Sequence, residues 1–300
     1  APTLFWSKPL ADPFGGTSLA NGRHPVKMNE PLPEGNVPDE VVYLILGTLQ
    51  FSEELLRTYA HPDLLKVAEA INGEDFVPFT EALFIKEPGV GASVAWHRDG
   101  TTHWDSPDFD EGTHGFNFMA QLYGCTSANG VWVVPGSHRE RYVDIADMVT
   151  RAGSERIEEA IPMICNPGDV VISNRQAVHG SFANTSSDWR ITINQGFHRR
   201  KSVLGVKGGG LHGKPAVYDA ERIIERSKVI KLAIEARKQR FPDEQAFEYK
   251  PLSASTEDFT WNAAARKRLH DYNLLDLSIS LNKITAFKRR KSNESSPRHK

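Results

Sequence analysis

Cysteine is scarce in this chain, which holds only Cys125 and Cys165, in separate segments. Two thiols are too few for a disulfide framework or a cysteine-based zinc site, although they leave a single disulfide open. Long apolar runs are also missing, since the longest covers residues 41–49 and a bilayer span needs roughly 20 residues. The first residues lack the basic and then apolar segments of a signal peptide. We therefore expect a cytoplasmic protein without a membrane partner.

An excess of charge of one sign is missing as well. The net charge is −2, so the chain as a whole has no electrostatic attraction for nucleic acid, and no such partner is expected. The apolar fraction of 39% and the charged fraction of 25% are ordinary for a globular protein. We expect one domain over residues 1–280, made of a proline-rich irregular arm (1–40), a barrel with supporting helices (41–200) and C-terminal helices (215–280). The basic stretch 281–300 is expected to be a disordered tail, with a nucleic-acid or partner contact as the alternative.

The local patterns predict a mainly β protein with flanking helices. Short segments rich in β-branched and aromatic residues are bounded by Gly, Pro, Asn or Asp, namely "FTEALFIK", "GFNFMAQLYG", "GVWVVPGSH", "GDVVISN" and "RITINQGFH". They favour a sandwich or barrel over a parallel α/β sheet. Two helices are predicted in "FSEELLRTYAHPDLLKVAEAING". Ser52 is the expected N-cap of the first, Pro62 lies in the first turn of the second, and Gly73 marks the end of the second. Helices are also expected at 219–241 and within 256–275.

A metal site is indicated by "WHRDG". Residues i and i+2 of a strand point to the same face, so His97 and Asp99 can offer an imidazole and a carboxylate to one ion. His179, in "AVHGSFANTSSDWR", is the best candidate for a third ligand. Two histidines and one carboxylate form the facial triad of non-haem Fe(II) oxygenases, which leaves three coordination positions open. Zinc is the alternative, although a catalytic zinc more often has three close ligands and one water.

A co-substrate would need its own anchor. A 2-oxo acid chelates iron through its keto and C1-carboxylate oxygens, and its distal carboxylate needs a bidentate cation. Arg190, at the start of "RITINQGF", can supply a guanidinium fork. Thr192 lies two positions on, on the same face, and can add a hydroxyl donor.

Other histidines compete for the metal. His138 and Glu140, in "PGSHRE", have the same spacing as the first pair. However, Pro135 and Gly136 place them in a turn, where two side chains need not share a face. His103 and His114 lie in the loop "TTHWDSPDFDEGTHG" and are expected to border a cleft or face solvent.

The ordered motifs "KEPG…WHRDG", "NGVWVVPGSHR" and "NPGDVVISNRQAVHGSFANTSSDWR" resemble the phytanoyl-CoA dioxygenase family of Fe(II)- and 2-oxoglutarate-dependent oxygenases, over about residues 60–198. The resemblance implies a double-stranded β-helix of the jelly-roll, cupin-like kind. It also implies that Fe(II) binds His97, Asp99 and His179, and that Arg190 and Thr192 bind the C5 carboxylate of 2-oxoglutarate. Inward residues of "GFNFMAQLYG" are implied to touch the co-substrate or else to be plain barrel core: Asn117, Met119 and Gln121. Family members commonly have acidic residues where Gly124 and Cys125 stand here.

The implied function is hydroxylation, or another oxidation at an unactivated C–H bond, of a small molecule, with O₂ as a further co-substrate and release of succinate and CO₂. Asp99 stands where related halogenases lack the carboxylate, which argues against halogenation. Desaturation, cyclisation and epimerisation stay open, as do a non-catalytic ligand-binding barrel and a Zn/Mn cupin-like hydrolase or isomerase. Predicted substrate contacts are Arg98, His103, Arg199 and Arg200, the last two in a basic, Gly-rich segment (199–214) that suits a lid or a solvated loop.

Overall fold

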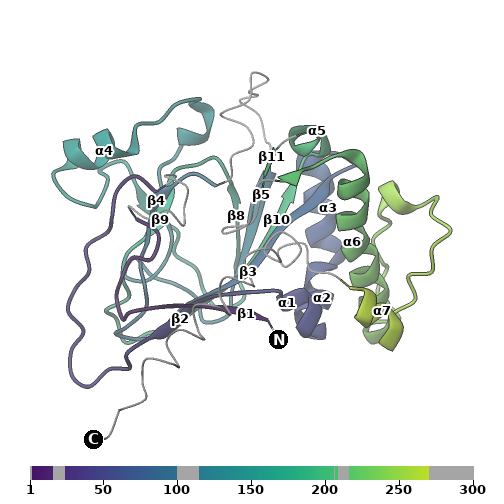
Figure 1. The fold of residues 1–300 in the computed structure, drawn as a ribbon, viewed down its shortest axis with the longest axis horizontal. Coiled ribbons are helices and arrows are strands. Elements are labelled where there is room, and N and C mark those ends of the chain that lie inside the picture. The colour runs from purple at the N-terminus through teal and green to yellow at the C-terminus, as the bar shows by residue number, and fades with distance from the viewer. Residues whose placement is uncertain (1, 16–23, 100–114, 206, 209–215, 270–300) are drawn as a thin grey trace, which may run out of the picture.

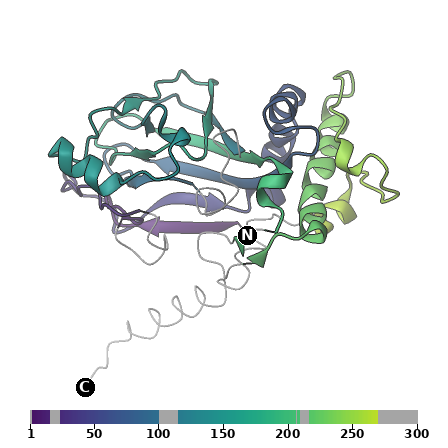
Figure 2. The same ribbon diagram turned by 90° about the horizontal axis from the view of Figure 1, so that it is seen from above.

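Two antiparallel sheets face each other, and a layer of helices covers the outer side of the larger one (Figure 1, Figure 2). The structure is a computed structural model that describes residues 2–15, 24–99, 115–205, 207–208 and 216–269. The larger sheet has the strand order β1-β2-β3-β10-β5-β8, with β1 (Thr3–Ser7), β2 (Val41–Leu46), β3 (Val77–Lys86), β10 (Arg190–His198), β5 (Gly115–Gln121) and β8 (Val170–Asn174). The smaller sheet has the order β4-β9-β6-β7, with β4 (Val94–His97), β9 (His179–Ser181), β6 (Trp132–Val133) and β7 (Ile161–Pro162). This arrangement is the double-stranded β-helix that was predicted.

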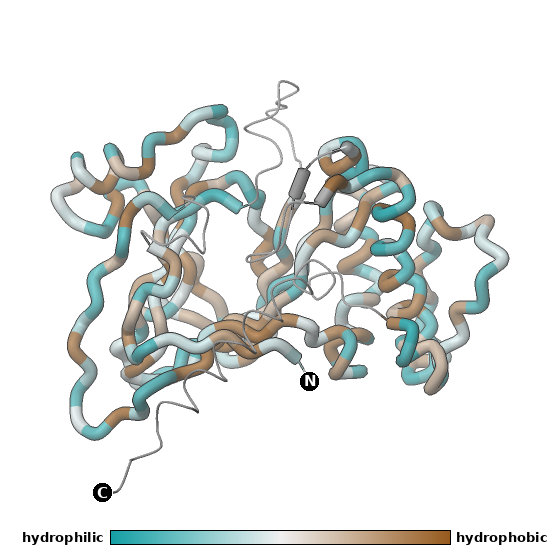
Figure 3. The backbone as a smooth tube through the Cα atoms, viewed as in Figure 1, coloured by the Kyte–Doolittle hydropathy of each residue, from teal (hydrophilic) through white to brown (hydrophobic). Residues whose placement is uncertain are grey.

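The space between the two sheets holds one hydrophobic core. Leu44 and Ala82 of the larger sheet pack with Trp96, Trp132 and Val178 of the smaller sheet and its margin. Burying each large apolar side chain contributes roughly 1.5–3 kcal/mol, so this core fixes the separation of the sheets. Apolar residues, brown in Figure 3, lie along the strands and helices, where hydrophilic residues are interspersed with them.

A second core lies between the larger sheet and the helices. Phe118 and Phe197 on the outer face of β5 and β10 pack with Leu56, Leu65 and Ile230. The helices involved are α1 (Thr48–Phe51), α2 (Glu53–Tyr59), α3 (Pro62–Asn72) and α6 (Ala220–Arg240). With one face of β5 and β10 used by this core, the opposite face of both strands points between the sheets.

The predicted helix signals are confirmed. Ser52 caps α2 by accepting from the backbone N–H of Leu55, Pro62 is in the first turn of α3, and Gly73 follows its last residue. The segment 219–241 forms α6, with Asp219 as its N-cap. Shorter elements complete the described chain: α4 (Ile145–Ala152), α5 (Arg200–Val203), α7 (Ala263–Arg268), the 3₁₀ turns η2 (Ser137–Arg139) and η3 (Lys250–Leu252), and the ribbon β11 (Lys207–Gly208) with β12 (Ala216–Val217).

The N-terminal arm is more regular than the sequence suggested. Residues 3–7 form β1, which pairs with β2, a strand that the proline-rich composition gave no reason to expect. The arm is then tied to the barrel where Leu10 N–H donates to Val90 O over 2.9 Å and Ser93 N–H donates to Ala11 O over 3.1 Å. The "GVWVVPGSH" strand is shorter than predicted, because the turn at Pro135 and Gly136 ends it after β6.

Several expectations concern residues outside the described part of the chain. Outside it lie the tail at 281–300, most of the basic segment's glycine run (209–210) and the end of the helical stretch (270–275).

No helix among the described residues is both long and apolar enough to cross a membrane. Cys125 and Cys165 are free thiols that face each other across an isolated antiparallel bridge, so the single disulfide left open by the sequence is not formed.

Candidate metal centre

The smaller sheet brings two histidines together. His97 ends β4 and His179 begins β9, and the antiparallel register places these two residues directly opposite each other. Asp99 follows two residues later, with its carboxylate 3.4 Å from His97 Nε2 and 3.7 Å from His179 Nε2. One ligand atom from each of the three residues lies within 4.8 Å of the others, close enough for one cation. The sequence therefore identified the three side chains that the fold brings together.

Both imidazole rings are oriented by the backbone. His97 Nδ1 lies 2.8 Å from the carbonyl of Ala95, and His179 Nδ1 lies 2.8 Å from the carbonyl of Ala177. A carbonyl oxygen only accepts, so each Nδ1 carries a hydrogen and each Nε2 is the nitrogen that faces Asp99. Burial and the nearby His97 lower the pKa of His179 to about 4, which keeps its ring neutral at pH 7. A neutral ring in a fixed orientation is what a metal requires.

Asp99 is held as an anion by polar neighbours. Asn117 Nδ2 donates to Asp99 Oδ2 over 2.9 Å, and Arg175 lies 3.7 Å from the same oxygen. Arg175 also donates to Asn117 Oδ1 over 2.6 Å, which closes a three-residue network. Burial alone would raise the pKa of Asp99, but the charge of Arg175 and the two histidines hold it well below its usual value. The carboxylate is thus charged and fixed in place.

A close backbone approach makes room for this network. A Cβ on Gly196 of β10 would lie 3.0 Å from Asn117 Oδ1, 3.1 Å from Arg175 Nη1 and 2.5 Å from Thr80 Cγ2. Any side chain there would displace the groups that hold Asp99. Glycine at this position is therefore required by packing against the network.

The candidate co-substrate residues lie on the inner faces of β10 and β5. Thr192 is paired in register with Gln121, and Asn194 with Met119, so all four point into the space between the sheets. Thr192 Oγ1 donates to Gln121 Oε1 over 2.8 Å. Asn117, on the same face, contacts Asp99, so the structure shows it supporting the carboxylate. Contacts of Asn117, Met119 and Gln121 with a co-substrate stay predictions.

Arg190 is a buried cation without a protein acceptor. It is 3% exposed, and within the described residues its guanidinium makes no hydrogen bond, the Nε being fully enclosed. Burial lowers the pKa of Arg190 to about 10, and the nearby Cys125 and Cys165 thiols act in the opposite direction. The group stays charged at neutral pH. An unpaired buried cation is costly, so this one is suited to receive an anion.

The rival metal pair is not brought together with other ligands. His138 lies in the 3₁₀ turn η2 and Glu140 follows it, and neither belongs to the metal-competent cluster found among the described residues. His103 and His114 lie outside the described residues. The turn predicted at Pro135 and Gly136, which made His138 a poor metal ligand, is present in the structure.

The predicted substrate residues have different surroundings. Arg98 is buried and donates to the carbonyls of Gln176 (2.7 Å) and Arg141 (3.1 Å), so it ties loops together. Arg199 and Arg200 are half-buried at the start of α5, just beyond the end of β10 that carries Gly196. Substrate contacts by these three, and by His103, stay predictions.

One neighbour of the triad was missed by the sequence analysis. His24, from the N-terminal arm, stacks on His97 with ring centroids 4.3 Å apart. Phe14 in turn stacks on His24, with ring centroids 5.1 Å apart. Its position depends on how the arm folds back. Asp12 fixes that fold by accepting from three backbone N–H groups, those of residues 14, 15 and 28. No local pattern around residue 24 signals this contact.

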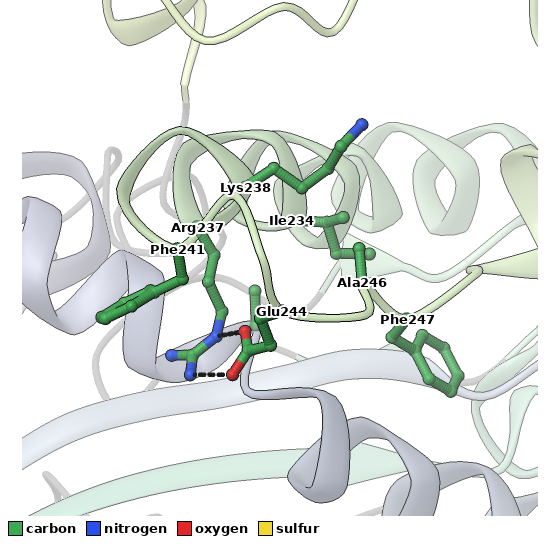
Figure 4. A pocket seen from close by; sticks show the side chains of 8 residues that line it. Ile234, Arg237, Lys238, Phe241, Glu244, Ala246 and Phe247 are labelled. Atoms are coloured by element: carbon green, nitrogen blue, oxygen red, sulfur yellow. Dashed lines mark hydrogen bonds and ion pairs between the residues drawn. The ribbon is translucent and has the colours of Figure 1, made fainter.

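A small pocket in the helical layer is a separate feature. It lies between the end of α6 and the following loop, with Arg237, Phe241, Glu244 and Phe247 among its residues (Figure 4). Arg237 donates to Glu244 Oε1 over 2.7 Å, so the charged groups there already have partners. The pocket is apart from the sheets that hold the triad (Figure 1), and we assign it no ligand.

The curated proteins that this chain resembles include two fungal dioxygenases. Dioxygenase cdmD of Talaromyces verruculosus is 31% identical over 165 residues, which are 52% of this chain and 50% of that protein. Dioxygenase lolE1 of Epichloe uncinata is 30% identical over 144 residues, which are 47% of this chain and 50% of that protein. The chain thus spans about half the length of these curated relatives. Among solved structures, EctD from S. alaskensis with bound Fe is 18% identical and covers 68% of this chain and 75% of that one, with a TM-score of 0.46.

The family model described as phytanoyl-CoA dioxygenase (PhyH) matches residues 42–192, from β2 to β10. The matched region contains the triad and Arg190. The predicted cofactors, Fe(II) and 2-oxoglutarate, are confirmed by the family and by the presence of a His-Asp-His site. The chain belongs to the phytanoyl-CoA dioxygenase family.

Proposed function

We propose that this protein is an Fe(II)- and 2-oxoglutarate-dependent oxygenase that hydroxylates a small molecule at an unactivated C–H bond. The observation that carries the proposal is the convergence of two imidazole Nε2 atoms and one carboxylate, with a guanidinium on the same inner surface of the barrel that has no acceptor among the described residues. A ligand-binding barrel without catalysis has no need for all four groups.

In this proposal His97, Asp99 and His179 hold the metal and leave three positions for co-substrate and O₂. When bound, Fe(II) with 2-oxoglutarate and O₂ supplies the oxidant and releases succinate and CO₂. Arg190 binds the distal carboxylate through its two-pronged donor, and Thr192 exchanges its bond with Gln121 for one to the same carboxylate. The enclosed Nε of Arg190 is consistent with a site built for an anion.

Hydroxylation is preferred to halogenation because a carboxylate ligand is present. Asp99 has two polar neighbours, Asn117 and Arg175, that fix it beside the histidines, so a halide has no vacant place at that corner. Arg199 and Arg200 lie at the metal end of β10, and we propose them as contacts for an anionic part of the substrate. Residues 1–280 are proposed to act as one domain.

The test is independent of the unknown substrate. Wild-type protein mixed anaerobically with Fe(II) and 2-oxoglutarate should show a weak visible charge-transfer band, and on exposure to O₂ it should form succinate slowly. His97→Ala, Asp99→Ala and His179→Ala should each abolish both signals, whereas His138→Ala should keep them. Retention of iron in His97→Ala together with its loss in His138→Ala would contradict the assigned ligands.

The same experiment separates the alternatives. A Zn- or Mn-dependent hydrolase or isomerase would form no charge-transfer band with Fe(II) and 2-oxoglutarate and no succinate. A non-catalytic barrel could bind 2-oxoglutarate but would not consume it in O₂. Either result would replace the oxygenase assignment.

A further inference from the structure

A second buried basic side chain lies beside Arg190. Lys86, the last residue of β3, is 2% exposed and is paired in register with Arg190, the first residue of β10. Directly opposed residues of an antiparallel pair have Cβ atoms about 4.5–5.5 Å apart and point to the same face. The two basic side chains therefore leave the larger sheet together and enter the space between the sheets.

The far end of Lys86 confirms that direction. Its ammonium donates to the backbone carbonyl of Phe182, which follows β9 of the smaller sheet. The side chain thus crosses the barrel interior from one sheet to the other. A lysine ammonium has three donors, and this carbonyl uses one of them. The ammonium of Lys86 makes no other hydrogen bond within the described part of the chain.

The part of the chain that the structure describes supplies no paired carboxylate to these two basic groups. Among the described residues, neither Lys86 nor Arg190 forms an ion pair with a carboxylate. Asp12 is the acidic group that acts on Lys86, but its two oxygens already accept from three backbone N–H groups. The Cys165 thiol near Arg190 is neutral, since burial raises its pKa to about 12. Burial and the charge of Arg190 hold the pKa of Lys86 well below its usual value, which shows that the bare site disfavours a second charge.

We propose that Lys86 is a positioning residue of the co-substrate site, binding the distal carboxylate of 2-oxoglutarate together with Arg190. This inference rests on the proposed function. Arg190 offers a planar fork to both carboxylate oxygens, while Lys86 approaches from the neighbouring strand as a compact third donor. Contacts from two strands hold the carboxylate against rotation about the fork. They also make the site selective for a 2-oxo acid that has a second carboxylate.

The test compares two 2-oxo acids in anaerobic titrations that follow the charge-transfer band. One is 2-oxoglutarate, and the other is 2-oxopentanoate, which has the same carbon chain with a methyl group in place of the distal carboxylate. Lys86→Gln keeps a donor for the Phe182 carbonyl but removes the charge, and Lys86→Met removes both. The matched control is Lys66→Met, a change at an exposed lysine on α3.

Loss of one charge-assisted hydrogen bond should raise the Kd for 2-oxoglutarate by about 10- to 100-fold in Lys86→Gln. The Kd for 2-oxopentanoate should not change, which a merely structural role would not reproduce. Equal weakening of both acids in both variants, or no weakening of 2-oxoglutarate, would overturn the inference. Lack of a band in wild-type protein would instead overturn the proposed function and the inference with it.

Discussion

Asn117 offers a sharp test of how Asp99 is held in place. Replacing it by Ala removes two hydrogen bonds that involve charged groups, one of 2.9 Å to Asp99 and one of 2.6 Å from Arg175. Each such bond contributes about 1.5–3 kcal/mol. Loss of a side chain that supports a metal ligand typically weakens metal binding by about 10- to 100-fold, or roughly 1.4–2.7 kcal/mol. We expect Asn117→Ala to weaken the metal by that factor.

The assay is anaerobic calorimetric titration with Fe(II), alongside thermal unfolding of the metal-free protein. Asn129→Ala is the matched control, because Asn129 is also buried and its Oδ1 accepts from the Thr126 N–H over 3.0 Å in a distant turn. Both variants should be less stable than wild type, but Asn129→Ala should bind the metal normally. Equal metal affinity in Asn117→Ala and wild type would show that the carboxylate needs no support from this amide.

Three further outcomes are expected. Arg190→Ala should weaken 2-oxoglutarate binding by about 2–5 kcal/mol and leave the metal affinity nearly intact, with partial rescue in Arg190→Lys, and unchanged co-substrate affinity would identify another anchor. Gly196→Ala should weaken metal binding, because the new Cβ would lie 3.0 Å from Asn117 Oδ1, and a normal metal titration would count against that clash. With a pKa of about 12, Cys165 is thiolate in about one molecule in ten thousand at pH 8, so its alkylation by iodoacetamide should be slow, rise with pH and accelerate on unfolding. Fast alkylation of the folded protein at pH 8 would contradict the burial of this thiol.

The sequence predicted those parts of the site that depend on local geometry. The spacing of His97 and Asp99 and the pattern at Arg190 and Thr192 follow from strand alternation, which needs no knowledge of strand pairing. The helix ends at Ser52 and Gly73 follow from capping chemistry in the same way. These features could be predicted because each is set within a few residues of chain.

What the sequence did not predict depends on pairing between distant segments. Lys86 becomes part of the site only through the register of β3 with β10, and nothing near residue 86 specifies that register. His24 reaches His97 only because Asp12 folds the arm back over the barrel. The guanidinium of Arg98 is bound to backbone carbonyls of two distant segments, at Gln176 and Arg141, which no local pattern indicated. Its substrate contact stays a prediction.

The opposed positions of His97 and His179 also have a consequence for strand register. β4 and β9 are only four and three residues long, and their ladder is irregular between Val94 and His97, so few backbone bonds fix the alignment. A slip of one residue would turn an imidazole to the opposite face of the sheet. A cation that needs both rings binds the correct alignment alone, and at 100 times its Kd it favours that alignment by about 2.7 kcal/mol. The metal ion that serves the chemistry would therefore also select the correct pairing of the two strands that bind it.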